Sequence, residues 1–294
     1  MGRKKSLFFG CGTAIVTPFS DGVVDYLAFG ELIEQQISGG ADAVVILGTT
    51  GEAPTIYENE RSEIISFAKR KIGSRVPLIV GTGSNATSVA VRYTKAAEAL
   101  GADGCLVVSP YYNKATSKGL VTHYKTIAKS VKIPIIMYNV PSRTGVNIPV
   151  DVYGELAKID NIVAVKEASG SIGYLTELIE KYGDYYDVYT GCDELTLPTL
   201  ALGGKGVISV VSNLLPSHIH QICAEYQNGN LKKAQELSLH ISPLIKELFC
   251  EVNPIPVKTA LAQMGLCKDE MRLPLCKSTR GKQISTLMKK YNLI

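Results

Sequence analysis

Eight short runs of apolar, largely β-branched residues recur along the chain as far as residue 210, and this repetition is the strongest constraint on its fold. Each run precedes a segment with the apolar spacing of a helix, which is the pattern of repeated βα units. Most runs are apolar throughout, as expected for parallel strands covered on both faces. Eight such units predict an α/β protein with a (β/α)₈ barrel, the TIM barrel. The runs are 12–16, 43–47, 77–80, 104–108, 134–138, 162–166, 187–190 and 206–210.

The segments between these runs are expected to be helices. After Gly229 the strand signals stop, and three further helical segments are separated by proline and glycine. We therefore expect a catalytic barrel over residues 1–228 and a C-terminal helical extension over 229–294, since barrels of this length form one domain. The expected helices are 26–39, 58–71, 84–100, 118–131, 150–158, 172–181, 195–202 and 216–228, followed by 232–249, 255–264 and 282–291.

The composition argues against several classes of partner. The net charge of +4 arises from 31 basic and 27 acidic residues without a basic, aromatic stripe, so nucleic acid is not expected. No run approaches the roughly 18 apolar residues of a membrane span. Seven scattered cysteines without a C-x-x-C pair indicate reduced thiols in a cytoplasmic protein. The basic segment Met1–Ser6 is expected to be a short tail rather than a signal peptide or a lipidation site.

Neither a metal nor a cofactor is expected. His218 and His220 are two residues apart on a predicted helix and therefore lie on different faces. The segment Gly81–Asn85 lacks the third glycine of a dinucleotide fingerprint, and Leu202–Gly206 lacks the ending of a phosphate-binding P-loop.

Lys166 ends the apolar run 162–166, where burial disfavours a charged side chain. A lysine held at low dielectric has a lowered pKa, and its neutral amine can form a Schiff base with a carbonyl compound. The alternative is a lysine that leaves the strand into solvent and has no chemical role.

Polar residues also follow two other predicted strands, at the end of the barrel where active sites form. Thr49 and Thr50 lie between glycines and form either a nest for a carboxylate or an ordinary turn before a helix. Tyr138 either transfers protons beside Lys166 or packs with its hydroxyl at the surface. Arg143 either binds a carboxylate through its planar fork or is solvated.

Five segments together closely resemble the dihydrodipicolinate synthase family, and the resemblance runs nearly from end to end. It implies a lyase, a pyruvate-dependent class I aldolase that condenses pyruvate with L-aspartate 4-semialdehyde in diaminopimelate and lysine biosynthesis. The segments are Gly48–Glu52, Pro110–Asn113, Tyr138–Gly145, Val165–Gly170 and Asn253–Lys258.

The resemblance assigns catalytic roles to four residues. Lys166 would carry the Schiff base, and Tyr138, Thr49 and Tyr112 would form its proton relay. In the family the equivalent of Tyr112 reaches into the site of a neighbouring subunit. The resemblance therefore implies a homo-oligomer, typically a homotetramer built as a dimer of dimers.

The resemblance also implies a set of substrate-binding residues. Thr50 matches the residue that holds the pyruvate carboxylate, and Arg143 matches the one that holds the semialdehyde carboxylate. Ile208 and Gly191 match positions that line the pocket.

One departure from the family concerns feedback inhibition. Lysine-inhibited members usually carry a histidine and a glutamate near the positions of Arg61 and Val89, whereas Asn85 and Tyr111 are retained here. Loss of the carboxylate removes a partner for the lysine ammonium, and Arg61 adds a like charge. We expect little or no inhibition by lysine.

Two alternatives remain. An N-acetylneuraminate lyase or a 2-keto-3-deoxy sugar acid aldolase of the same superfamily would share the lysine and the tyrosine, although Arg143 and the pair Tyr111–Tyr112 favour the synthase. A noncatalytic barrel that binds a keto acid would not need the complete set of lysine, tyrosine and threonine.

Overall fold

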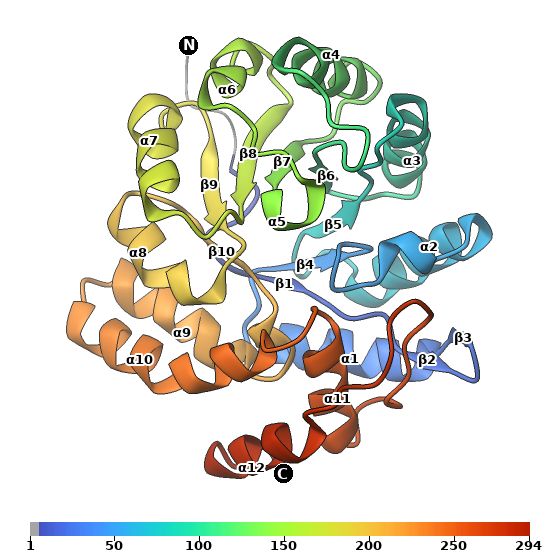
Figure 1. Cartoon of the computed structure of the whole chain (residues 1–294), viewed down its shortest axis with the longest axis vertical. Coiled ribbons are helices and arrows are strands. Elements are labelled where there is room, and N and C mark those ends of the chain that lie inside the picture. The colour runs from blue at the N-terminus through green and yellow to red at the C-terminus, as the bar shows by residue number, and fades with distance from the viewer. Residues whose placement is uncertain (1–5) are drawn as a thin grey trace.

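The computed structural model describes residues 6–294, so the tail expected at the N-terminus lies, apart from Ser6, outside the described residues. Eight parallel strands close into a barrel, as predicted (Figure 1). Each strand pairs with the next in sequence, and the last pairs with the first through the register Cys11 to Val207. The strands are β1 (Gly10–Ala14), β4 (Ala43–Ile46), β5 (Leu78–Gly81), β6 (Gly104–Val108), β7 (Ile135–Asn139), β8 (Ile162–Glu167), β9 (Asp187–Thr190) and β10 (Gly206–Ser209).

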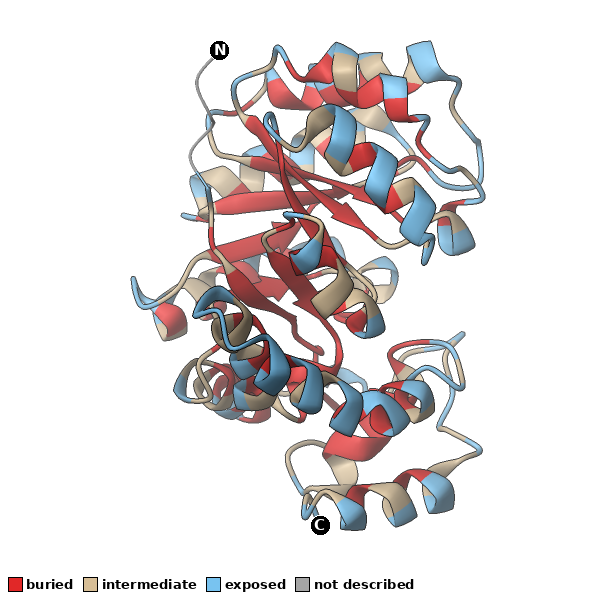
Figure 2. Ribbon diagram, turned by 90° about the vertical axis from the view of Figure 1, so that its left-hand side faces the viewer, coloured by how far each residue is buried: buried red, intermediate tan, exposed pale blue. Residues whose placement is uncertain are grey.

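Helices surround this barrel, and Figure 2 shows that their outer faces are exposed while the strands are buried. Two predicted boundaries were wrong by about one turn. Asn85 belongs to a loop, in which its carbonyl accepts a hydrogen bond from Asn113, and the following helix therefore begins only at Thr87. The helix after β6 ends at Ala128, where Ser130 folds back onto the Ile127 carbonyl. The helices are α1 (Tyr26–Ser38), α2 (Glu58–Ile72), α3 (Thr87–Ala99), α4 (Ser117–Ala128), α6 (Val150–Leu156), α7 (Ile172–Tyr182), α8 (Thr196–Ala201) and α9 (Pro216–Gln227).

Several short elements were not predicted because they are too short to show periodicity. The strands β2 (Phe19–Ser20) and β3 (Val23–Val24) form a hairpin around Asp21 and Gly22, which both have positive φ. The helix α5 (Pro141–Thr144) begins at a proline and ends at Gly145 in the left-handed conformation. Three 3₁₀ helices complete the set: η1 (Ala53–Thr55), η2 (Asp193–Leu195) and η3 (Val211–Asn213).

The C-terminal part of the chain consists of three helices, α10 (Leu231–Leu248), α11 (Ile255–Gln263) and α12 (Gly281–Lys290). The helix α10 packs along α9, and α12 packs along α11 (Figure 1). The expected boundary after residue 228 falls in the turn between α9 and α10, and its status as a domain boundary stays a prediction. Within residues 6–294, no helix combines the length and the apolar character that crossing a bilayer requires.

A small apolar cluster fills the barrel interior. The Phe8 ring stacks on Tyr189 with centroids 4.3 Å apart, and the Tyr189 hydroxyl donates a 2.6 Å hydrogen bond to the Phe8 carbonyl. A Cβ atom at Gly12 would lie 2.8 Å from this ring, so glycine provides the room for it. Because Phe8 lies two residues before the start of β1 and packs in the interior cluster, it closes the amino-terminal end of the barrel.

Replacing Phe8 with alanine should lower the free energy of unfolding by about 3 kcal/mol, because it leaves a cavity in the barrel interior. Urea unfolding followed by circular dichroism measures this loss. Leu27, which is 77% exposed on α1, provides the control, and Leu27→Ala should change stability by less than about 0.5 kcal/mol. A Phe8→Ala variant as stable as Leu27→Ala would show that the ring does not close the barrel.

Candidate active site

Lys166 lies inside the barrel and does not leave β8 into solvent. Its side chain is buried, and its Nζ atom lies 4.5 Å from the centroid of the Tyr138 ring. Burial lowers the pKa of Lys166 to about 8, the influence of Asp193 and Cys192 opposes this shift, and that of Arg143 adds to it. Roughly a tenth of the amine is therefore neutral at pH 7, far more than for a lysine in water.

Tyr138 lies beside Lys166 because β7 and β8 pair in parallel with these two residues in register. The tyrosine is buried, and burial raises the pKa of its phenol, while a side-chain hydrogen bond with Thr49 acts in the opposite direction. Its hydroxyl therefore does not lie at the surface. The structure brings Lys166, Tyr138 and Thr49 together, each from a different strand or strand end.

The loop after β4 holds Thr49 and Thr50 in a tight turn. Leu47 and Glu52 bound it with left-handed backbone conformations, at φ values of 54° and 53°. The Thr50 side chain is buried and its Oγ1 accepts a 3.0 Å hydrogen bond from Asn253 Nδ2. This turn leads into the 3₁₀ helix η1, whose N-cap is Glu52, while α2 begins only at Glu58.

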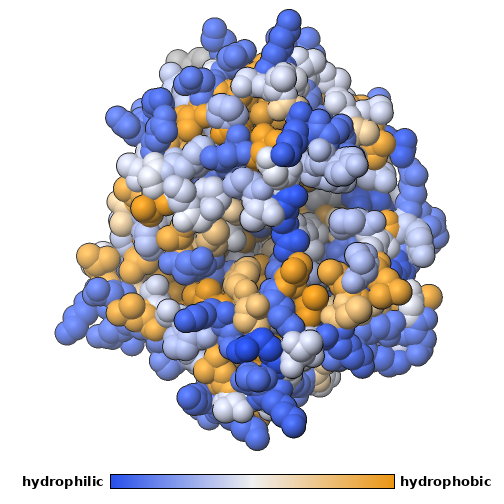
Figure 3. Space-filling view, in the orientation of Figure 1, coloured by the Kyte–Doolittle hydropathy of each residue, from blue (hydrophilic) through white to orange (hydrophobic). Residues whose placement is uncertain are grey.

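Arg143 lies on α5, the short helix after β7. Arg143 is exposed to solvent, but its Nη2 atom donates a 2.9 Å hydrogen bond to the Asn253 carbonyl. A cavity of about 430 Å³ is lined by Thr49, Tyr138, Arg143 and Asn253, and it extends to Arg61. Figure 3 shows the face of the molecule with α5 in front, hollowed near its centre.

Gly191 lies near Lys166, and Ile208 lies in the barrel interior. A Cβ atom at Gly191 would come within 2.7 Å of Lys166 Cε, so only glycine leaves the lysine stem its space. Ile208 belongs to the apolar cluster of the barrel interior that includes Tyr138. Gly191 therefore lies against the lysine stem and Ile208 lies in the barrel interior with Tyr138, and the role of both in lining the substrate pocket stays a prediction.

Tyr112 is the one predicted site residue that the structure leaves apart. It is 89% exposed in the loop after β6, and its backbone has a left-handed φ of 69°. Within residues 6–294, no described contact joins its side chain to Lys166 or Tyr138.

Sequence reasoning missed Asp193 and Asn253. Asp193 is buried after β9, where it accepts hydrogen bonds from the Ser209 hydroxyl and the Val210 amide, and burial raises its pKa to about 6. Its position just after a strand end was the signal that could have found it. Asn253 lies within a segment that the sequence comparison singled out without a role.

This arrangement has a definite chemical capacity. A buried amine with a lowered pKa can attack a carbonyl carbon, and an adjacent phenol can exchange the protons that the loss of water requires. Thr50 and Arg143, on two loops at the same end of the barrel, supply a hydroxyl and a guanidinium that suit carboxylates.

Comparison with known proteins finds relatives that match this chain along nearly its whole length. The model of the dihydrodipicolinate synthetase family matches residues 7–290. A 4-hydroxy-tetrahydrodipicolinate synthase of Alkaliphilus oremlandii is 46% identical over 290 residues, which cover 98% of this chain and 100% of the relative.

Solved structures agree in fold as well as in sequence. The crystal structure of dihydrodipicolinate synthase from Aquifex aeolicus has a TM-score of 0.95 and 45% identity, covering 97% of this chain and 99% of that one. The enzyme from Acinetobacter baumannii, solved in complex with pyruvate, has a TM-score of 0.95 and 42% identity, covering 97% and 99%. With its closed barrel, its buried lysine and these full-length matches, the chain belongs to the dihydrodipicolinate synthetase family.

Proposed function

We propose that Lys166 is the amine through which this lyase condenses pyruvate with L-aspartate 4-semialdehyde, the reaction of a 4-hydroxy-tetrahydrodipicolinate synthase in lysine biosynthesis. The observation that carries the proposal is the burial of Lys166 against Tyr138, with a pKa of about 8. The 46% identity to a synthase and the pyruvate complex of the Acinetobacter relative support it.

The chemistry follows from the positions of the two side chains. Neutral Lys166 attacks the keto carbon of pyruvate, and Tyr138 supplies the proton with which the carbinolamine oxygen leaves as water. The imine loses a methyl proton to give an enamine, whose carbon attacks the aldehyde carbon of the second substrate. The amine of that substrate then displaces Lys166, which closes the ring and frees the enzyme.

Two residues are proposed to bind the substrate carboxylates. Thr50 would hold the carboxylate of pyruvate, and Arg143, which lines the cavity, would hold that of the semialdehyde in a bidentate pair. Gly191 and Ile208 would shape the space around the imine, because Gly191 lies against the Lys166 stem and Ile208 belongs to the same interior cluster as Tyr138.

The proton relay is proposed to pass from Tyr138 through Thr49 to Tyr112 of a second subunit. An exposed tyrosine with a left-handed backbone is an uncommon and strained feature, which suits a side chain that a partner holds in place.

We propose a homotetramer, a dimer of dimers, and a cytoplasmic location. The separation of the chain into a catalytic barrel and a C-terminal extension at residue 228 belongs to the same proposal.

Weak feedback by lysine stays a prediction, and the surroundings of Arg61 support it. Arg61 is buried, donates a 2.6 Å hydrogen bond to the Gly81 carbonyl and stacks 4.2 Å from the centroid of the Tyr93 ring. This fixed positive charge lines the cavity together with Val89 and would repel a lysine ammonium.

Borohydride reduction in the presence of pyruvate should attach a pyruvate-derived group to Lys166 alone, because only a neutral amine forms the imine. Peptide mass analysis locates the adduct. Lys258 is equally buried but paired with Glu52, and it is the internal control that should remain unmodified. An adduct on another lysine would contradict the assignment.

The same enzyme should then be assayed with aspartate semialdehyde and with N-acetylmannosamine. Turnover of the semialdehyde supports the synthase. Turnover of the sugar alone would instead establish the alternative, a lyase for N-acetylneuraminate, and an adduct without turnover of any aldehyde would leave a keto-acid-binding barrel.

Replacing Tyr138 with phenylalanine should lower kcat by about a hundredfold or more, because general acid catalysis of water loss disappears. Steady-state kinetics measure this loss. Tyr186→Phe is the matched control, since the buried Tyr186 hydroxyl donates a 2.7 Å hydrogen bond to the Tyr153 carbonyl and the residue lies just before β9, at the opposite end of the barrel strands from Lys166. Equal kcat values for the two variants would exclude Tyr138 from the relay.

A further inference from the structure

The proposed substrate site depends on a segment far along the chain, Asn253–Lys258, at the start of α11. Asn253 contacts both proposed carboxylate-binding residues: its Nδ2 atom donates to Thr50 Oγ1 at 3.0 Å, and its carbonyl accepts from Arg143 Nη2 at 2.9 Å. The Asn253 side chain is buried, so water does not readily replace these contacts.

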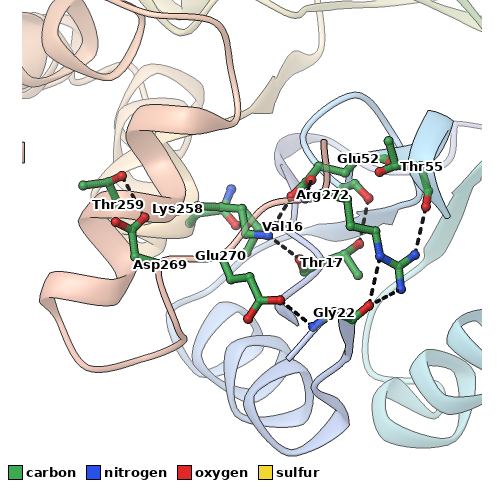
Figure 4. Close-up of polar contacts among 12 residues, drawn as sticks. Val16, Thr17, Gly22, Glu52, Thr55, Lys258, Thr259, Asp269, Glu270 and Arg272 are labelled. Atoms are coloured by element: carbon green, nitrogen blue, oxygen red, sulfur yellow. Dashed lines mark hydrogen bonds and ion pairs between the residues drawn. The ribbon is translucent and has the colours of Figure 1, made fainter. Parts of the chain in front are cut away.

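The other end of this segment is fixed to the same loop by a buried ion pair. Lys258 Nζ lies 2.6 Å from Glu52 Oε1 and donates a second hydrogen bond of 2.9 Å to the Thr17 carbonyl. The second oxygen of Glu52 accepts a 3.1 Å hydrogen bond from the Arg272 amide. Figure 4 shows Glu52 between Lys258 and Arg272. Hydrogen bonds from the C-terminal part of the chain therefore fix the loop that carries Thr50.

We infer that Asn253 is a positioning residue, which sets Thr50 and Arg143 at the separation that the two substrates require. This inference rests on the proposed function, since it takes Thr50 and Arg143 as the groups that bind the carboxylates. Thr50 follows β4 and Arg143 lies on α5, and the described structure contains no direct hydrogen bond between them. Asn253 alone contacts both and so connects the loop after β4 with the helix α5.

On this inference the barrel supplies the groups that bind the substrates, and the C-terminal extension fixes their positions. Small errors in the placement of reacting groups cost large factors in rate, so a loop-borne binding group needs a rigid support. The Lys258–Glu52 pair provides that support because it is dry and doubly hydrogen-bonded on each side. Asn253 then transmits the position of the segment to both binding groups.

The test replaces Asn253 with alanine and with aspartate. Asn253→Ala should raise the KM for pyruvate by about five- to tenfold, with a smaller change in kcat, because it removes the hydrogen bond to Thr50. The KM for the semialdehyde should change less, because Arg143 bonds to the main-chain carbonyl of residue 253, which alanine retains. Asn253→Asp keeps the size of the side chain but adds a negative charge next to Thr50, beside the proposed pyruvate carboxylate, and it should raise the KM for pyruvate further.

The control is Asn161→Ala. The Asn161 side chain also joins two segments, through hydrogen bonds of 2.9 Å and 3.0 Å to the carbonyls of Ala128 and Val131, but it lies before β8, at the opposite end of that strand from Lys166. This variant should lose thermal stability while keeping wild-type KM values. Because the aspartate variant preserves the shape of the side chain, its kinetics decide the matter if the alanine variant does not fold.

A second readout separates this inference from the proposed function. The pyruvate concentration that half-saturates borohydride trapping at Lys166 should rise about five- to tenfold in Asn253→Ala. Wild-type KM values and wild-type half-saturation in both Asn253 variants would overturn the positioning role, while trapping at Lys166 itself would still stand. Failure of the unaltered enzyme to trap pyruvate at Lys166 would instead overturn the proposed function.

Discussion

The active site of this structure depends on the free-energy cost of burying the positive charge of a lysine. Two lysines lie inside the fold, and their surroundings differ in one respect. Lys258 has the carboxylate of Glu52 at 2.6 Å, whereas no carboxylate in the described chain lies within ion-pair distance of Lys166. Burial disfavours the charged form at both positions, but only at Lys258 does an adjacent carboxylate oppose it strongly. Lys258 is therefore a structural residue, whereas the amine of Lys166 is available for a chemical reaction.

This difference has a thermodynamic consequence. The pKa of Lys166 falls from its ordinary value of 10.5 to about 8, so the unfolded chain binds the proton more tightly than the folded one. The free energy of unfolding therefore rises with pH between these two values, and below about pH 8 the residue costs stability. The packing around Lys166 adds no steric cost at this point, since Gly191 leaves room for its stem. A stability deficit at this position is typical of residues retained for reactivity.

The sequence allowed the prediction of those parts of the site that depend on strand ends. Lys166 and Tyr138 end neighbouring parallel strands, so their proximity followed from the barrel alone, and the structure confirms it. Asn253 could not be found in this way, because 110 residues separate it from Arg143 and no periodicity relates an irregular turn to a strand end. The hairpin around Asp21 and the short helix α5 escaped prediction because elements of two to four residues carry turn signals and no repeat.

The most direct measurement is the titration of the Lys166 amine itself. The rate at which pyruvate becomes trapped on Lys166, measured by quenching with borohydride at a series of pH values, follows the fraction of neutral amine. That fraction increases as pH rises through the pKa, so half of the limiting rate should be reached near pH 8. A midpoint near 10.5, the value of a lysine in water, would show that the barrel does not lower the pKa of this amine, and the account of the site would be wrong.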